Sequence, residues 1–239
     1  MKCSIIFTIV VILSFLPREF SEAQWKRVDG SAEQTSTHSQ TETPTPEPRI
    51  GVAIGMGVNY VNAQDVVDHI RGRVGLGQDV PEFKSAVDFF GAMSFPLSHE
   101  WILKFEYAYL LGTYNVAGFF GPTEFSFSAH MPTIIGQYVL AEEGSYNIKA
   151  GAGIGYHFGV LTESMGTFED KLTGRGLGSL VELEANTAFS DDFYGYIGAN
   201  LRWEFIGDLT SSTRTGSAGS VPTLHFFGIG ARFGFAYYI

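Results

Sequence analysis

The chain has 239 residues, with 25 acidic and 15 basic side chains, and a formal net charge of −10 at pH 7. An acidic balance argues against nucleic acid as a partner, because a phosphate backbone selects for basic surfaces. Aromatic residues reach 15% and glycine contributes 29 positions. Without a long apolar segment after the first residues, this composition is typical of a membrane barrel rather than a helical membrane protein.

The first 23 residues predict a secretory signal peptide. A basic start at Lys2 precedes an apolar run that ends before Pro17. This run is shorter than the roughly 20 residues that a spanning helix needs, and small residues near Ala23 suit a signal peptidase. Cleavage there removes Cys3, the only cysteine, so neither an internal disulfide nor a thiolate metal site is expected in the mature chain.

Residues 24–48 are predicted to be a disordered tether. The segment is rich in Ser, Thr, Gln, Glu and Pro and has very few apolar residues. Such a composition cannot bury enough surface to offset the entropy lost on ordering.

From residue 49 to residue 239, apolar residues alternate with small or charged ones. A period of two indicates β-strands. The pattern predicts an all-β fold, an eight-stranded antiparallel up-and-down transmembrane β-barrel. Pro132 suggests a bulge or break in the fourth strand. The strands are expected at 49–60, 83–95, 100–111, 123–140, 146–158, 176–189, 193–206 and 222–239.

The connections alternate between long and short. Long connections are expected at 61–82, 112–122, 159–175 and 207–221, and short turns at 96–99, 141–145 and 190–192. This alternation is typical of barrels with long external loops and tight periplasmic turns. The segment 61–82 could form a short amphipathic helix, and loops 61–82, 159–175 and 207–221 are candidate contacts for a surface ligand.

The two faces of the strands suggest which one is inside. One row is crowded with aromatic residues, and the other holds glycines and charges, which fit the narrow bore of an eight-stranded barrel. The apolar row then faces outer-membrane lipid. His130 and His157 could join the interior. The charges predicted to form a lumen network are Arg49, Lys84, Asp88, Lys104, Glu106, Lys149, Glu182, Glu184, Arg202, Glu204 and Arg232.

Aromatic side chains on the outward row are expected to form girdles at the membrane interfaces, where Trp and Tyr are favoured. The predicted members are Tyr60, Trp101, Tyr107, Tyr109, Phe125, Trp203, Phe205 and Tyr237.

Two segments carry a resemblance to a known family. Residues 125–138 (FSFSAHMPTIIGQY) and 146–159 (YNIKAGAGIGYHFG) resemble the corresponding run of small OmpA/OmpW-type outer-membrane β-barrel domains. The alternating C-terminal strand, ending in Tyr237-Tyr238-Ile239, is similar to the signature that the barrel-assembly machinery reads, although Ile239 replaces the usual Phe. The resemblance implies a location in the bacterial outer membrane. It leaves the activity open.

Three classes of function remain. A structural or surface-contact barrel with a salt-bridge-filled lumen is the main prediction, because unpaired lumen charges would be costly. A narrow channel for ions or small solutes, apolar ones included, is the alternative. An enzyme is remote: His69 lies near Asp65 and Asp68, with Ser211 and Ser212 in another loop, but no nucleophile motif surrounds them. We expect no catalytic residues, cofactor or metal site.

Overall fold

The computed structural model describes residues 49–74, 83–118, 121–143, 145–166, 168–211 and 223–239, and these are mostly β-strand. The predicted signal peptide and tether lie outside the described residues. The strands are β1 (Gly51–Asn62), β2 (Phe83–Pro96), β3 (Trp101–Gly118), β4 (Gly121–Glu143), β5 (Tyr146–Met165), β6 (Phe168–Ala188), β7 (Phe193–Ile206), β8 (Thr210–Ser211) and β9 (Leu224–Tyr238), and the helix α2 (Gln64–Val74) follows β1.

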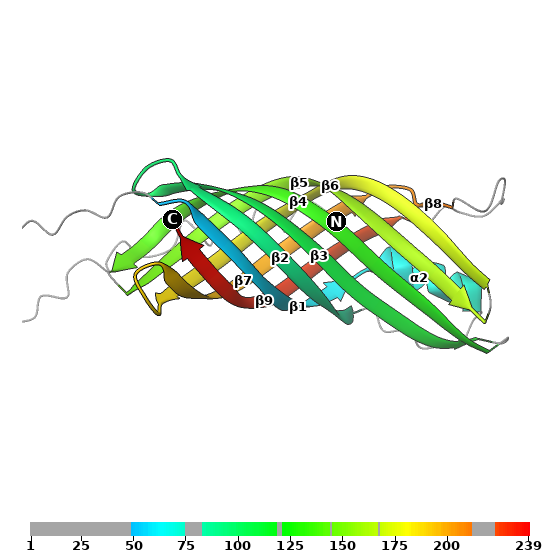
Figure 1. Ribbon diagram of the computed structural model, residues 1–239. Helices are drawn as coiled ribbons and strands as arrows, with labels where there is room; N and C mark the ends of the chain where they lie inside the picture. The colour runs from blue at the N-terminus through cyan, green and yellow to red at the C-terminus, as the bar shows by residue number, and fades with distance from the viewer. Residues whose placement is uncertain (1–48, 75–82, 119–120, 144, 167, 212–222) are drawn as a thin grey trace, which may run out of the picture. The chain divides into compact units, whose positions relative to one another are not determined.

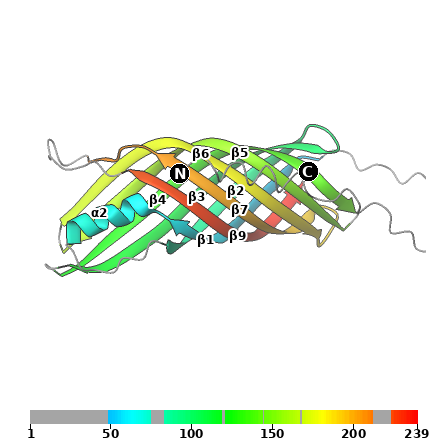
Figure 2. The same cartoon turned by 180° about the vertical axis from the view of Figure 1, so that it is seen from behind.

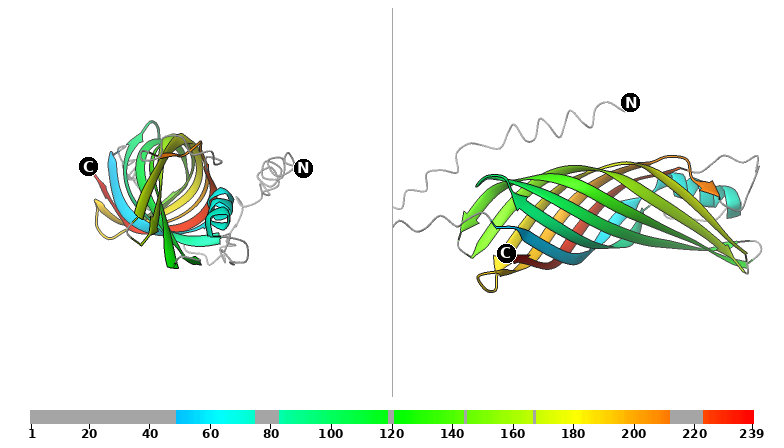
Figure 3. Two further views of the ribbon diagram at one scale, coloured as in Figure 1. Left: turned by 90° about the vertical axis from the view of Figure 1, so that its right-hand side faces the viewer. Right: turned by 45° about the horizontal axis from the view of Figure 1, so that its top comes forward.

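The long strands close into a barrel. Neighbours in the chain pair antiparallel, and β9 pairs with both β1 and β7. Around the ring the order is β1-β2-β3-β4-β5-β6-β7-β9, and the pairing of β9 with β1 closes it. Figures 1 and 2 show the tilted strands from opposite sides, and Figure 3 shows the ring nearly end-on. The predicted eight-stranded barrel is confirmed, and closure leaves no long strand with an unpaired edge.

Several strands extend beyond their predicted ends. The connections expected at 112–122 and 159–175 are mostly strand, because β3 and β4 form one long hairpin and β5 and β6 form another. The short turn expected at 141–145 begins only after Glu143. The predicted helix in 61–82 is present as α2. For these two connections the prediction of a long loop was wrong, because outward positions in the hairpins are polar, which ends the apolar alternation on that face.

The irregularity in β4 lies elsewhere than predicted. Pro132 pairs with Tyr107 of β3, and the register toward β5 is the same on either side of it. The shift in register falls between Val139 and Ala141. Pro132 points outward, where its missing N–H interrupts the ladder to β5 without moving the strands.

The outer surface carries an apolar belt. Large apolar side chains at every second position stay accessible, for example Ile54 at 65%, Ile154 at 72% and Ile197 at 70% exposure. The opposite positions on the same strands hold glycines and buried charges. A closed sheet with this pattern is stable against lipid, because the ladders pair the backbone groups of neighbouring strands and the outward side chains are apolar.

Toward the α2 end the pattern reverses. On β3 the outward residues change from Tyr107 and Leu111 to Thr113 and Asn115, while Tyr114 on the inward face is buried. The described part of the barrel therefore has two zones. In the belt zone the outside is apolar and the inside polar, and in the zone near α2 the inside is apolar and the outside polar, as in a water-soluble barrel.

The helix α2 closes this second zone. Val66, Val67 and Ile70 are fully buried against apolar side chains that point inward from the strands. Asp65 contacts Thr223, just before β9, and His225 of β9, and His69 contacts Glu163 of β5, three strands away from β9 around the ring. No helix within the described ranges is long and apolar enough to cross a bilayer.

Candidate functional site

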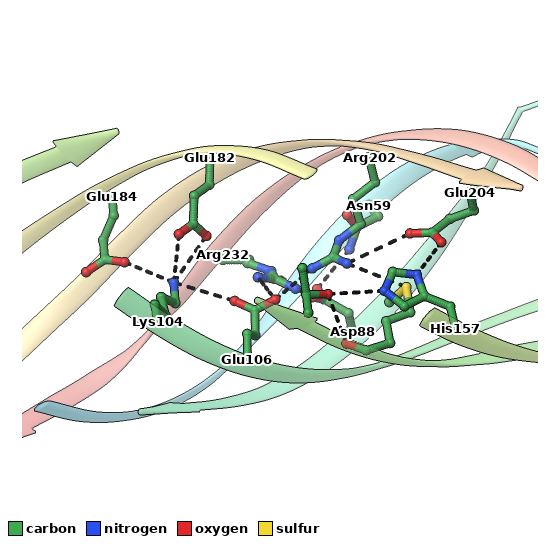
Figure 4. Close-up of polar contacts among 12 residues, drawn as sticks. Asn59, Asp88, Lys104, Glu106, His157, Glu182, Glu184, Arg202, Glu204 and Arg232 are labelled. Carbon is green, nitrogen blue, oxygen red and sulfur yellow. Dashed lines mark hydrogen bonds and ion pairs between the residues drawn. The ribbon is translucent and has the colours of Figure 1, made fainter. Parts of the chain in front are cut away.

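The centre of the lumen is organised around Glu106 of β3. Its Oε1 accepts a hydrogen bond from Arg202 Nη2 at 2.7 Å and one from Arg232 Nη1 at 2.9 Å. Arg232 Nε also donates to Asp88 Oδ2 at 2.7 Å, and Asn59 donates to the other oxygen of Asp88 at 2.8 Å. These side chains come from five strands and are at most 3% exposed (Figure 4). The contacts therefore fasten opposite walls of the barrel to each other.

A second group lies around Lys104, on the side of Glu106 away from His157 in Figure 4. Lys104 Nζ donates to Glu182 Oε1 at 3.0 Å and to Glu184 Oε2 at 3.1 Å. Gln137 donates to the same two carboxylates at 2.8 and 2.9 Å. Lys149 Nζ lies 3.3 Å from Glu184 Oε1. The ammonium of Lys104 is also 3.5 Å from Glu106 Oε2, so the two groups form one network.

His157 extends the network toward the α2 end. Its Nδ1 contacts Glu204 Oε2, and its Nε2 lies 3.2 Å from Thr133 Oγ1. His157 is fully buried and Glu204 is 1% exposed. Arg202 Nη1 lies 4.0 Å from Glu204 Oε1, which links this pair to the central one. Charge-assisted contacts of this kind lower the cost of burying ions away from water.

Two predicted members of the lumen network lie elsewhere. Arg49 is at the rim opposite α2, where it pairs with Asp192 and its side chain is 38% exposed. Lys84 is half-buried at the other end, with its Nζ 5.7 Å from the ring centre of Tyr114. Both lie near strand ends, beyond the stretch in which the barrel wall encloses inward charges. The remaining nine predicted side chains are buried inside the barrel: Asp88, Lys104, Glu106, Lys149, Glu182, Glu184, Arg202, Glu204 and Arg232.

An apolar layer fills the lumen beyond the charges. Phe125, Phe127 and Tyr114 point inward and pack with Leu161 and the buried face of α2. The prediction of Phe125 as an interface aromatic was wrong, because it lies in the zone where the inward face is apolar. Burial raises the pKa of the Tyr114 hydroxyl to about 12. Bulky rings therefore occupy the bore in this zone, where the expectation of a bore filled by glycines and charges does not hold.

The other predicted interface aromatics point outward. Tyr109 and Trp203 are half-buried. His130 shares this outward face, contrary to the suggestion that it joins the interior: its Nδ1 lies 2.6 Å from the hydroxyl of Tyr107, and the Tyr109 ring packs on it at 4.6 Å. The exposed members of the predicted girdles are Tyr60, Trp101, Tyr107, Phe205 and Tyr237.

The charge pattern alone missed the neutral members of the site. Gln137, Asn59 and Thr133 bond the buried ions directly, and Asn200 is buried beside them. For Asn59 and Asn200 the signal in the sequence is parity, because each shares the inward row of its strand with glycine or charged residues. Thr133 and Gln137 carry no such signal, because their neighbours on the inward row of β4 are apolar. Buried atoms without a hydrogen-bond partner among the described residues include Asn59 Oδ1, both amide atoms of Asn200, Arg202 Nε and Glu204 Oε1.

The loop residues considered for catalysis do not converge. His69 contacts Glu163, whereas Asp65 contacts Thr223 and His225. Ser211 donates to Asp170 at 2.7 Å, and Ser212 lies outside the described residues. Within the described segments, no group of three His, Cys, Asp or Glu side chains is placed to hold a metal ion.

No family model matches the sequence, and no curated protein matches it. Solved structures do match. OprG from Pseudomonas aeruginosa is 14% identical, with 80% of this chain and 96% of that chain covered and a TM-score of 0.50. For Ail from Yersinia pestis the identity is 9%, the coverage 80% and 100%, and the TM-score 0.48. For Neisserial surface protein A they are 11%, 80% and 97%, and 0.46. At these identities the likeness concerns the fold, which is that of small bacterial outer-membrane β-barrels.

Proposed function

We propose that this chain is an outer-membrane barrel with a structural or surface-contact role and a lumen closed to solutes. The observation that carries the proposal is that two separate layers of side chains close the bore. Buried ion pairs centred on Glu106 cross the bore in the belt zone, and an apolar layer capped by α2 fills the next zone. A solute would have to separate paired buried charges and then displace packed rings, and either step is costly.

The surface-contact part rests on the two long hairpins. Beyond the belt, β5 and β6 stay paired as far as Met165 and Phe168, and β3 and β4 as far as Gly118 and Gly121. Outward residues there are polar or charged, including Lys171. A paired hairpin presents such side chains in fixed positions, which suits recognition better than a mobile loop. We propose this surface as the site of any external ligand.

Conductance recording tests the closed lumen. The full-length chain is extracted from membranes, its fold is checked by a heat-modifiability gel shift, and it is inserted into planar bilayers. We expect no discrete conductance steps. Steps in folded protein that change when Lys104→Gln alters the lumen charge would overturn the proposal and establish the channel.

The narrow channel is the second candidate, and one observation favours it. Asn59, Asn200, Arg202 and Glu204 each have a buried polar atom in the bore that makes no hydrogen bond, within the part of the chain that the structure describes. Such atoms are expected to bond water, and a continuous file of water could carry ions. The charge dependence of any conductance separates this candidate from a leak around the barrel.

Two further interactions belong to the proposal. The apolar belt is the contact surface for outer-membrane lipid. The alternating end of β9, with Phe233, Phe235 and Tyr237 outward, is proposed as the segment that the assembly machinery recognises. A catalytic role is the least supported alternative, because the candidate Ser and His side chains have other partners.

A further inference from the structure

The outer face of β1 to β5 carries a groove with a volume of about 650 Å³. Two rows of side chains border it, and each row runs across the strands along the pairing direction. The first row, across the strands in order, is Ile54, Gly91, Tyr107, Pro132 and Tyr156. The second row runs from Val52 on β1 to Ile154 on β5, and on β3 it lies two residues farther from α2 than the first row does.

The groove exists because the first row has a gap. Gly91 has no side chain, and a Cβ built on it would meet only the carbonyl oxygen of Ala53, at 3.9 Å. Pro132 adds only a short ring. Tyr107 lies between them and is 51% exposed. The belt is therefore hollowed at these positions, while the backbone beneath keeps its register.

The dimensions match those of a lipid chain. Five adjacent strands about 4.8 Å apart span roughly 19 Å. Barrel strands tilt by about 40°, so a row across them is inclined at about 50° to the membrane normal and covers roughly 12 Å of depth. One leaflet of the hydrocarbon layer is about 15 Å thick. An extended acyl chain lying in the groove would thus cover less depth than one leaflet of the hydrocarbon layer.

A polar group lies just beyond the first row, on its α2 side. Because the strands are tilted, a line drawn across them from β1 to β5 moves toward the α2 end of the barrel, which is at the right in Figure 1. His130 lies two residues beyond Pro132 on β4, outward, and its ring is held by Tyr107 and Tyr109. With Nδ1 engaged by Tyr107, the ring's other nitrogen has no partner among the described residues and can bond an ester or phosphate oxygen.

We propose that this groove is a binding site for one acyl chain of a phosphate-bearing lipid of the outer leaflet. The chain lies between the two rows and crosses the gap at Gly91, and its polar end contacts His130. The occupant is lipid because the groove is continuous with the apolar belt, which is the surface of the barrel that meets the bilayer. The proposal rests on the membrane location proposed above, but not on a closed lumen.

Native mass spectrometry of the delipidated full-length chain, titrated with dipalmitoyl phosphatidylglycerol, tests the site. We expect one saturable lipid per barrel. Gly91→Leu fills the gap and displaces about two methylene groups, so binding should weaken about tenfold. Gly91→Ala should lie between it and wild type. Gly136→Leu is the matched control, because Gly136 also faces lipid with open space around it but does not border the groove.

His130→Phe separates the two parts of the site. It keeps the ring on Tyr109 and removes the bond to Tyr107, so it should weaken phosphatidylglycerol binding but leave dipalmitoylglycerol, which lacks the phosphate, unchanged. The heat-modifiability shift of each variant reports its fold. The proposal is overturned if wild type shows no saturable lipid, if Gly91→Ala and Gly91→Leu bind as wild type does, or if Gly136→Leu loses as much. None of these outcomes bears on conductance.

Discussion

Glu106 Oε1 accepts from Arg232 Nη1 at 2.9 Å across the bore, and the same oxygen accepts from Arg202 at 2.7 Å. The three residues lie on β3, β9 and β7. Of these strands, β7 and β9 are hydrogen-bonded neighbours, whereas β3 pairs with neither of them. One carboxylate therefore supplies contacts between walls of the barrel that the backbone ladders do not join.

Removing this carboxylate should destabilise the barrel strongly. Glu106→Gln keeps the shape but leaves two buried guanidinium groups short of counter-charge, and breaking a buried pair typically costs about 3–5 kcal/mol. In lipid vesicles, with unfolding monitored by tryptophan fluorescence, we expect the variant to reach its unfolding midpoint at a lower urea concentration than wild type. Asp192→Asn, which breaks the exposed pair with Arg49, is the control and should change little. Equal midpoints for Glu106→Gln and wild type would show that the network does not hold the walls together.

Small residues on the inward face should resist substitution. A Cβ at Gly57 would lie 2.7 Å from Arg232 Cγ and 2.8 Å from the carbonyl oxygen of Ala231, so the strand or the ion pair must move. Gly57→Ala should therefore destabilise by roughly 1–3 kcal/mol. Gly136→Ala, on the lipid face with open space, is the matched change. The prediction fails if the two variants unfold at the same urea concentration.

The position of α2 should depend on its apolar face. Ile70→Asp places a carboxylate in the fully buried apolar layer, which should release the helix while the belt zone stays folded. Trypsin cleavage at Arg71 should then become faster without loss of the heat-modifiability shift. Gly72→Ala, on the exposed side of the helix, should leave cleavage unchanged or slow it, because alanine stabilises a helix by about 1 kcal/mol. Unchanged cleavage in Ile70→Asp would mean that these contacts do not hold the helix.

The belt zone could be predicted from the sequence because one rule governs it. Where the outside is lipid, apolar and polar residues must alternate, and the charges on the other parity are forced inward. Lys104, Glu106, Arg202 and Arg232 follow this rule and were found from parity alone. Their partners were not, since which carboxylate meets which cation depends on where opposite walls face each other, and parity carries no such information.

The zone near α2 was harder because the rule inverts there. Phe125 was assigned to the membrane surface by its ring, yet its neighbours on the other parity are Glu124 and Ser126, which cannot face lipid. That local reversal is the available signal. Arg49 was misplaced for a different reason: it has inward parity but stands before β1, where no opposite wall encloses it.

Accessibility of spin labels along β3 tests the central claim, that the barrel reverses its faces between the belt and the α2 zone. Single cysteines, introduced in a Cys3→Ser chain at Phe105, Leu111, Thr113 and Asn115, are labelled with nitroxides in lipid vesicles. We predict high accessibility to oxygen and low accessibility to a water-soluble nickel complex at 105 and 111, and the opposite at 113 and 115. Nickel access at 105 equal to that at 115 would contradict the account.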